Sequence, residues 1–220
     1  MTASTVSAAE VRSAVRRVAA ALREHNEYLT ELDQAMGDGD LGITAKKIAS
    51  ALEDYAASEP GDDLGKYIMT AGMKINSAAP STLGTLLASA LMRAGREARG
   101  QAQLDAGLLA AMLQAADQGV QERGKARPGD KTMIDALHPA AEAFAAAVER
   151  GDGLSAAGRE MLAAAQQGLE AAVPLQSRIG RAGWVGERTQ GKIDPGCAFI
   201  VTVLRSITGE EPQGAEGGGL

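Results

Sequence analysis

Apolar residues recur every three or four positions along most of the chain, which is the spacing of an amphipathic α-helix. The first stretch of this kind has its apolar side chains at Val11, Val15, Val18, Leu22, Leu29 and Leu32. Ser7 and Glu10 stand before it in the order of a capping box, a combination that predicts a helix start. Glycine, proline and small polar residues interrupt the pattern at intervals, so we predict a series of helices joined by turns.

Seven further stretches follow the same period. They cover residues 43–55, 64–75, 82–92, 104–120, 130–148, 154–173 and 195–207. Two of them have a recognisable start, because Asp130 is a suitable N-cap and Asp194 is followed by Pro195 at the first helical position. His25 falls inside the first stretch. The periods together predict eight helices and an all-α fold, in which abundant alanine favours helix and lets the helices pack closely.

The turn between the first two predicted helices is acidic. It lies in LTELDQAMGDGDLG, residues 29–42, and brings Asp33, Asp38 and Asp40 close together among glycines. Carboxylates this close repel each other unless a cation lies between them, and oxygen ligands suit a hard ion such as Mg²⁺. An EF-hand calcium loop would need Glu where this chain has Ala49, so magnesium is favoured. As a bare motif, Gly-Asp-Gly-Asp is equally typical of an ordinary turn.

Two other segments have residue types that bind anions. Residues 78–85 are mostly small or hydroxyl-bearing and lead into a helix. The first backbone amides of that helix could bind a phosphate. Ser and Thr at this position also serve as plain N-caps. Residues 175–193 follow no period and place cations among glycines, which suits anion contact or, alternatively, a solvated basic loop. The cations are Arg178, Arg181, Arg188 and Lys192. A Walker A motif is rejected at 186–192, because Ile193 follows where Ser or Thr is needed.

Composition narrows the class of protein. The net charge of −6 argues against a nucleic-acid surface, and no apolar run is long enough to span a bilayer. Cys197 is the single cysteine, so no intramolecular disulfide can form and a cytoplasmic location is expected. We expect a domain over residues 1–208 and a flexible tail over 209–220. No nucleophile–base arrangement is evident, so any catalysis would rest on metal, phosphate positioning and electrostatics.

Four stretches together resemble the dihydroxyacetone kinase family, namely its nucleotide-binding L subunit or the fused C-terminal domain (DhaL-like, DAK2). They are LTELDQAMGDGDLG at 29–42, APSTLGT at 79–85, RGKARPGDKTMIDAL at 123–137 and GRAGWVGERTQGKIDPG at 180–196. The fourth is the most specific, since Gly-Arg-Ala, Gly-Glu-Arg and Asp-Pro-Gly keep the order and spacing of the family. The resemblance implies an antiparallel barrel of eight helices with a nucleotide bound at one end by the loops between helices.

The resemblance also implies a set of site residues. Asp33, Asp38 and Asp40 would hold two Mg²⁺ ions that bridge the phosphates of ADP or ATP. The nucleotide would be contacted by Gly42, Thr44, Ser81, Thr82, Gly124, Met133, Arg181, Asp194, Pro195 and Gly196. Gly124 and Met133 would flank the base.

Two functional hypotheses follow from the resemblance. The first is a kinase subunit that phosphorylates a hydroxyl of dihydroxyacetone or a related triose or tetrulose held by a separate K subunit. Its phosphoryl donor would be ATP or a phosphotransferase-system protein, and a homodimer is a further expectation. The second is a non-catalytic nucleotide sensor, because Leu41 stands where the family usually has His, and the phosphate loop is shorter than the usual Gly-Gly-rich one. A purely structural helical bundle is the third class.

Overall fold

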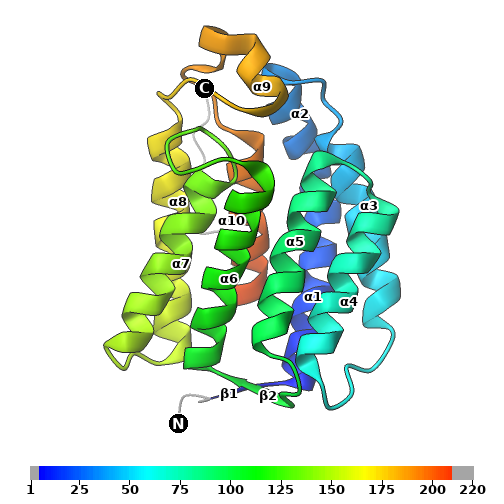
Figure 1. Ribbon diagram of the computed structural model, residues 1–220. Helices are drawn as coiled ribbons and strands as arrows, with labels where there is room; N and C mark the ends of the chain where they lie inside the picture. Colours follow the sequence, from blue (N-terminus) through cyan, green and yellow to red (C-terminus); the bar gives the residue numbers. More distant parts are fainter. Residues whose placement is uncertain (1–4, 210–220) are drawn as a thin grey trace, which may run out of the picture.

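Long helices stand side by side in a closed ring and alternate in direction (Figure 1). The computed structural model describes residues 5–209. The long helices are α1 (Ala8–Glu24), α2 (Asn26–Met36), α3 (Leu41–Ala56), α4 (Leu64–Ala78), α5 (Thr82–Glu97), α6 (Ala106–Gly124), α7 (Ile134–Glu149), α8 (Leu154–Ala172) and α10 (Pro195–Thr208). Each packs against the next around the ring, and α10 contacts both α8 and α1 and so closes it. The predicted all-α antiparallel barrel is confirmed.

The first predicted helix is divided in two. His25 ends α1 with φ −90° and ψ 10°, and its Nδ1 lies 3.0 Å from the carbonyl oxygen of Ala21. Its own carbonyl accepts the N–H of Leu29, so α2 resumes at once and continues α1 toward the upper end of the barrel (Figure 1). The apolar period runs through this break, which is why the sequence predicted a single helix.

The predicted start of α7 is wrong by three residues, because the N-cap is Met133 and not Asp130. Lys131 has φ +58°, and an L-residue in this left-handed region cannot continue a helix. Asp130 therefore does not cap α7, which begins at Ile134; its carboxylate accepts the backbone N–H of Arg127 at 2.9 Å instead. The irregular segment before α10 also has structure that the period did not predict, the short α9 (Gly180–Val185) and the 3-10 turn η1 (Gly186–Thr189).

Two short strands were not predicted. β1 (Thr5–Ser7) and β2 (Gln103–Asp105) pair antiparallel, with Thr5 opposite Asp105, and lie below the helices in Figure 1. Leu104, which the period assigned to a helix, is the buried centre of β2. We refer to the end of the barrel that carries this strand pair as the ribbon end.

Small residues bring the helices into close contact. A Cβ added to Gly65 of α4 would lie 2.3 Å from the carbonyl oxygen of Gly95 on α5, so these two backbones touch. The ring encloses an apolar cavity of about 640 Å³, lined by side chains such as Leu22, Leu52 and Phe144. Within residues 5–209, no helix is long and apolar enough to cross a membrane. The predicted tail falls on residues 210–220, outside the described range.

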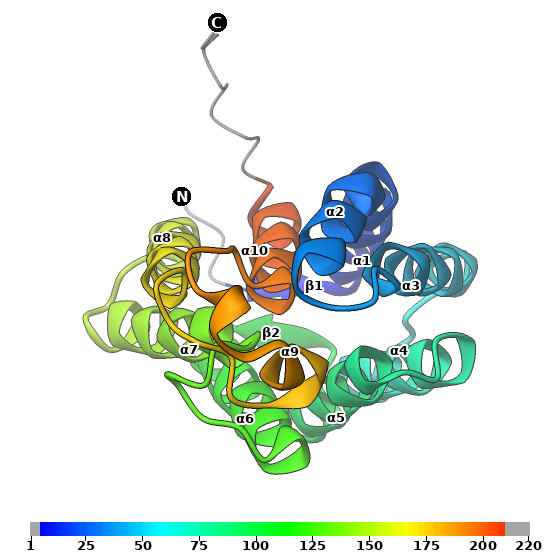
Figure 2. The same cartoon turned by 90° about the horizontal axis from the view of Figure 1, so that it is seen from above.

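The end opposite the ribbon, the upper end, carries the loops of interest. Residues 37–40, 79–81, 125–133 and 173–194 connect helices there, and together they contain or adjoin the site residues predicted from the sequence (Figure 1). Seen from above, α9 lies over the ring of helices rather than within it (Figure 2). The alternation of helix direction is what gathers loops far apart in sequence at one end.

Candidate functional site

Three aspartates form a compact cluster at the upper end. Asp33 lies in the last turn of α2, and Asp38 and Asp40 lie on the turn that leads to α3. One carboxylate oxygen from each residue lies within 4.8 Å of the others. Asp38 and Asp40 are exposed and Asp33 is partly buried, so the cluster opens to solvent. Carboxylates at this separation, all of them oxygen donors, match what a hard divalent cation requires.

Glycines shape the acidic turn. A Cβ on Gly37 would lie 2.6 Å from Oδ1 of Asp33, so a side chain here would displace that carboxylate. Gly39 has φ +77°, a conformation that glycine adopts without strain. The backbone N–H of Leu41 donates to Oδ2 of Asp33 at 3.1 Å and orients the carboxylate. The turn is therefore built to hold Asp33 beside the other two acids.

The start of α3 is pressed against α2. A Cβ on Gly42 would lie 1.9 Å from Oγ1 of Thr30, so only glycine allows this approach. The side chains of Leu41 and Thr44 are both buried. Asp40 occupies the N-cap position, yet its side chain makes no capping hydrogen bond to the first turn of α3. The predicted contacts Gly42 and Thr44 thus lie next to the acidic cluster, with the Thr44 hydroxyl carried by a buried side chain.

The turn between α4 and α5 contains the segment that the sequence predicted to bind a phosphate, residues 78–85. Ser81 is the N-cap of α5, and its hydroxyl accepts the N–H of Gly84 at 3.1 Å. Its own N–H donates to Ala79, so Ser81 is engaged in shaping the turn. Thr82 begins the helix and is exposed. A helix leaves its first N–H groups without intrahelical partners, and those of Thr82 and Leu83 are the donors that this turn offers to an anion.

The loops before α7 and α10 bring two predicted residues together. Met133 is buried, and a Cβ added to Gly196 would lie 3.1 Å from its backbone nitrogen. Pro195 is buried at the first position of α10. Gly124 ends α6, where an added Cβ would lie 3.3 Å from Leu86 on α5. The structure thus joins Met133 to the start of α10, and Gly124 to α5.

Asp194 is a buried acid at the start of α10. Its carboxylate caps the helix by accepting the N–H of Cys197 at 2.7 Å. Burial raises the pKa of Asp194 from 3.8 to about 6, and the hydrogen bond from the backbone N–H of Cys197 lowers the pKa in part. The buried Cys197 thiol donates to the carbonyl of Thr132 at 2.9 Å, and burial raises its pKa as well, so it is an unreactive packed group.

The segment from Val173 to Asp194 closes over this end. Lys192 belongs to the predicted basic loop, but its Nζ donates to the carbonyl of Ala35 at 2.7 Å, just before the acidic turn. Arg178 is exposed, with Nη1 at 3.8 Å from Oδ1 of Asp130. Arg181 lies on α9, and its side chain is outside what the structure describes.

Sequence reasoning missed Lys131, whose ammonium is buried beneath this segment. Its Nζ donates to the carbonyl oxygens of Val173, Thr189 and Lys192 at 2.8, 2.8 and 2.7 Å. Burial lowers the pKa of Lys131 below the ordinary value for lysine, and Asp194 opposes this effect. Lys131 lies in the stretch RGKARPGDKTMIDAL, but nothing in that stretch indicates its buried role, because all three of its partners are distant in sequence.

The structure is thus an antiparallel helical barrel that carries an acidic turn and a basic segment together at one end. The chain belongs to the DAK2 domain family, whose model matches residues 35–209. This confirms the resemblance drawn from the four sequence stretches.

Individual relatives agree with this assignment. The PEP-dependent dihydroxyacetone kinase, ADP-binding subunit DhaL, of Escherichia coli (strain K12) is 29% identical over 182 residues, covering 83% of this chain and 87% of that protein. The D-erythrulose kinase of Mycolicibacterium smegmatis is 31% identical over 199 residues, covering 90% of this chain and 34% of that protein. The dihydroxyacetone kinase of C. freundii has the same fold, with a TM-score of 0.72 at 24% identity over 96% of this chain and 36% of that one. Its complex with AMP-PNP and Mg²⁺ gives a TM-score of 0.70 at 24% identity, over 94% of this chain and 35% of that one.

Proposed function

We propose that this chain is the nucleotide-binding subunit of a dihydroxyacetone-type kinase. In this function it holds ADP or ATP with Mg²⁺ and delivers a phosphoryl group to a hydroxyl of a short ketose bound by a separate K subunit. The observation that carries the proposal is the acidic cluster, in which Asp33, Asp38 and Asp40 approach within 4.8 Å on a turn that glycines shape. Such a cluster is costly without a cation, and a cation there would face the start of α3.

The chain's own residues have distinct parts in the proposed site. Asp33, Asp38 and Asp40 would hold the ions, two by the family's pattern, and Leu41 would fix Asp33 through its backbone N–H. Bound Mg²⁺ would neutralise charge on the phosphates. Gly42 and Thr44 would approach the phosphates from the start of α3.

The remaining predicted residues would surround the nucleotide. Amides at the start of α5, in the turn of Ser81 and Thr82, would donate to phosphate oxygens. Gly124 and Met133 would flank the base from the α6–α7 loop. The site would be closed by Arg181, Asp194, Pro195 and Gly196.

The names of the relatives support the reaction class. One is called an ADP-binding subunit of a PEP-dependent dihydroxyacetone kinase, and another a D-erythrulose kinase. Both acceptors are short ketoses, which supports a ketose hydroxyl as the acceptor here. The donor is ATP or, as in a PEP-dependent system, a phosphoprotein that recharges bound ADP. Either donor requires the same metal and phosphate contacts from this chain.

Calorimetry of Mg-ADP binding tests the proposal. Asp38→Asn and Asp40→Asn each remove a charged ligand at nearly constant volume, and we expect each to weaken Mg-dependent binding by about a hundredfold. Asp62→Asn is the matched control, because Asp62 is also an exposed loop aspartate but follows α3 at the ribbon end. Equal affinity of wild type and both cluster variants, or no binding by the wild type, would contradict the proposed function.

Leu41 favours a second candidate, a nucleotide sensor without transfer activity. Its side chain is buried in the core, so only its backbone N–H faces the acidic turn. Mixing the chain with a K subunit, dihydroxyacetone or erythrulose, and ATP separates the two candidates. Formation of the ketose phosphate supports the kinase, whereas tight Mg-ADP binding with no transfer from ATP or a phosphoprotein donor supports the sensor.

A further inference from the structure

Lys131 is among the largest side chains that are completely buried within residues 5–209, with 1% of its surface exposed. An ammonium has three N–H donors and no acceptor, and all three donors here have carbonyl partners. A buried charge is costly unless it is fully hydrogen-bonded, so the protein retains Lys131 at a cost that apolar packing would avoid. Its backbone is also in the left-handed region, at φ +58°. Both features indicate a specific task.

The three acceptors mark both ends of one segment. Val173 lies at the end of α8, Thr189 ends η1, and Lys192 stands two residues before the cap of α10. The N–H of Gly191 also donates to Val173, at 2.9 Å, so the two ends of the segment meet over the ammonium. Lys131 thus closes this stretch into a loop, in the way that a bound cation closes a loop through carbonyl ligands.

The same segment is tied to the acidic turn. The backbone carbonyl of Lys192 accepts a hydrogen bond from Lys131 Nζ, and the Nζ of Lys192 donates to the carbonyl of Ala35. Ala35 lies two residues before Gly37, on the helix that carries Asp33. A continuous path of hydrogen bonds therefore runs from the Lys131 ammonium to the end of α2, and a displaced segment would release this end of the turn.

We infer that Lys131 is a positioning residue for the metal–nucleotide site, holding the segment over residues 173–194 closed and, through Lys192, steadying the acidic turn. This inference rests on the proposed function. The segment carries Arg181 on α9 and ends at Asp194, so its closure sets where these groups stand. Because closure has to reverse before a nucleotide leaves, loss of the ammonium accelerates release more than it slows binding.

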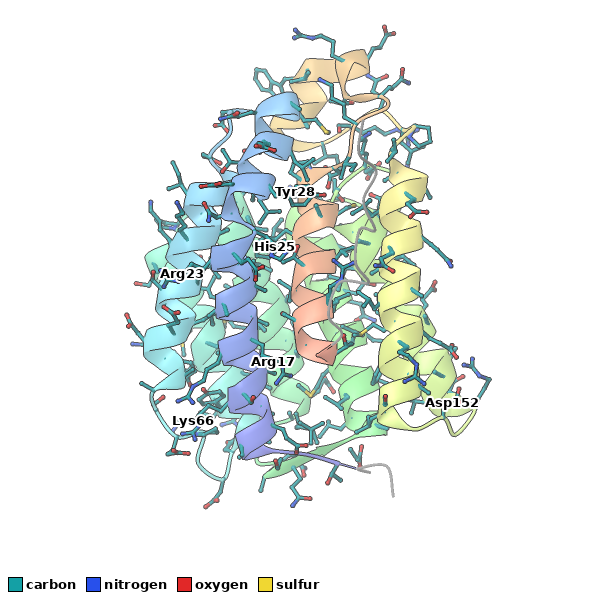
Figure 3. The ribbon with its side chains drawn as sticks, turned by 180° about the vertical axis from the view of Figure 1, so that it is seen from behind. Arg17, Arg23, His25, Tyr28, Lys66 and Asp152 are labelled. Carbon is teal, nitrogen blue, oxygen red and sulfur yellow. The ribbon has the colours of Figure 1, made fainter. Side chains whose placement is uncertain are left out.

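Lys131→Met removes the ammonium and keeps an unbranched apolar stem. Lys192→Met cuts only the link to Ala35 and leaves the backbone carbonyl on Lys131. Lys66→Met is the control, because Lys66 is exposed on α4 near the ribbon end (Figure 3). The readouts are the affinity and dissociation rate of Mg-ADP, hydrogen exchange along the chain, and the fluorescence anisotropy of Trp184, the only tryptophan, which is exposed on α9.

For Lys131→Met we expect Mg-ADP affinity to fall by about tenfold or more, chiefly through faster dissociation. Amide protection should be lost over residues 173–194 and kept in α1 and α3, and the anisotropy of Trp184 should fall. Lys192→Met should weaken binding by roughly threefold to tenfold while the segment stays protected. Lys66→Met should match the wild type in every readout.

Wild-type affinity and wild-type exchange in Lys131→Met would overturn the inference while leaving the proposed function standing. Absence of Mg-ADP binding by the wild type would overturn both. If Lys131→Met loses protection in every helix, Lys192→Met decides, because the Lys192 side chain is only partly buried and can be removed without loss of the fold. Unchanged affinity of Lys192→Met in that case overturns the inference.

Discussion

The two ends of the barrel differ in how some of their helices begin. At the ribbon end, Ser7, Asp63 and Asp105 each cap their own helix with a side-chain hydrogen bond, as helix-start residues of this type usually do, and α8 begins after Gly153, which has no side chain to form a cap. At the upper end, Ser81 and Asp194 cap α5 and α10 in the same way, whereas α3 and α7 begin at Asp40 and Met133 without a side-chain cap. Departures from local rules concentrate where a protein uses residues for another purpose. The two uncapped starts lie at Asp40 and Met133, which are residues of the proposed nucleotide site.

Charge is also treated differently at the two ends. Asp152 lies near the ribbon end (Figure 3). It pairs on the surface with the half-exposed Arg150, which also pairs with Glu160, and ion pairs of this kind contribute little to stability. Near the upper end, Lys131 and Asp194 are buried in the loops and caps beside α7 and α10. Burying charge is unfavourable unless each group is hydrogen-bonded. Both groups at the upper end are hydrogen-bonded, so the fold holds them in a fixed arrangement.

Replacing one glycine by alanine at each end should give the largest difference in stability and in Mg-ADP binding. Gly42→Ala forces a Cβ to within 1.9 Å of Oγ1 of Thr30 and 2.4 Å of the Asn26 carbonyl, so α2 and α3 have to separate. We expect a loss of about 3 kcal/mol in the free energy of unfolding, together with loss of Mg-ADP binding. Denaturant unfolding and calorimetry measure the two effects.

Gly107→Ala is the matched change at the ribbon end. The nearest atom to its added Cβ is Oδ1 of Asp105 at 3.6 Å, and the residue lies in the first turn of α6. Alanine favours helix over glycine, so stability should rise by about 0.5 kcal/mol with binding unchanged. If Gly42→Ala proved as stable as Gly107→Ala, the close contact between α2 and α3 would not constrain the acidic turn.

The sequence predicted the fold wherever the signal is local. The capping box of Ser7 and Glu10 and the start of α10 at Asp194 and Pro195 are confirmed as expected, since such caps depend on neighbours within three residues. The β1–β2 pair was missed because each strand has three residues and its partner is distant in sequence. The helix period gave no warning of either strand.

The candidate site also contains residues that a local signal predicts and residues whose partners are too distant in sequence to predict. The grouping of Asp33, Asp38 and Asp40 could be predicted because glycines between close acids leave few conformations other than a tight turn. Lys131 could not, because its partners Val173 and Lys192 are 42 and 61 residues away. Contacts of this kind come from how the ring closes, which a single sequence does not display.

The pH dependence of stability should sharpen the contrast in buried charge. The pKa of Asp194 is raised from 3.8 to about 6, so the folded protein holds this proton more tightly than the unfolded chain does. Stability from this group is thus present at low pH and is lost as pH rises from about 4 through about 6, a change of about 3 kcal/mol at most. Asp194→Asn keeps the cap acceptor and removes the titration.

We therefore expect Asp194→Asn to unfold at higher temperature than the wild type at pH 7.5, and at nearly the same temperature below pH 4, in scanning calorimetry. Asp63→Asn supplies the ribbon-end control, because hydrogen bonds from the N–H groups of Lys66 and Gly100 lower the pKa of Asp63 below its ordinary value. A wild type whose stability rises between pH 4 and pH 7 by more than Asp194→Asn does would contradict the assignment.

The smallest expected effect compares two serine caps. Ser7 accepts the N–H of Glu10 at the ribbon end, and Ser81 accepts the N–H of Gly84 at the upper end. Replacing either serine with alanine removes one cap and should cost about 1 kcal/mol of unfolding free energy. Only Ser81→Ala should also weaken Mg-ADP, by a few fold, because the turn that presents the first amides of α5 loosens. Equal Mg-ADP affinity in both variants would mean that the α4–α5 turn contributes stability alone, and that the two ends differ less than their charges indicate.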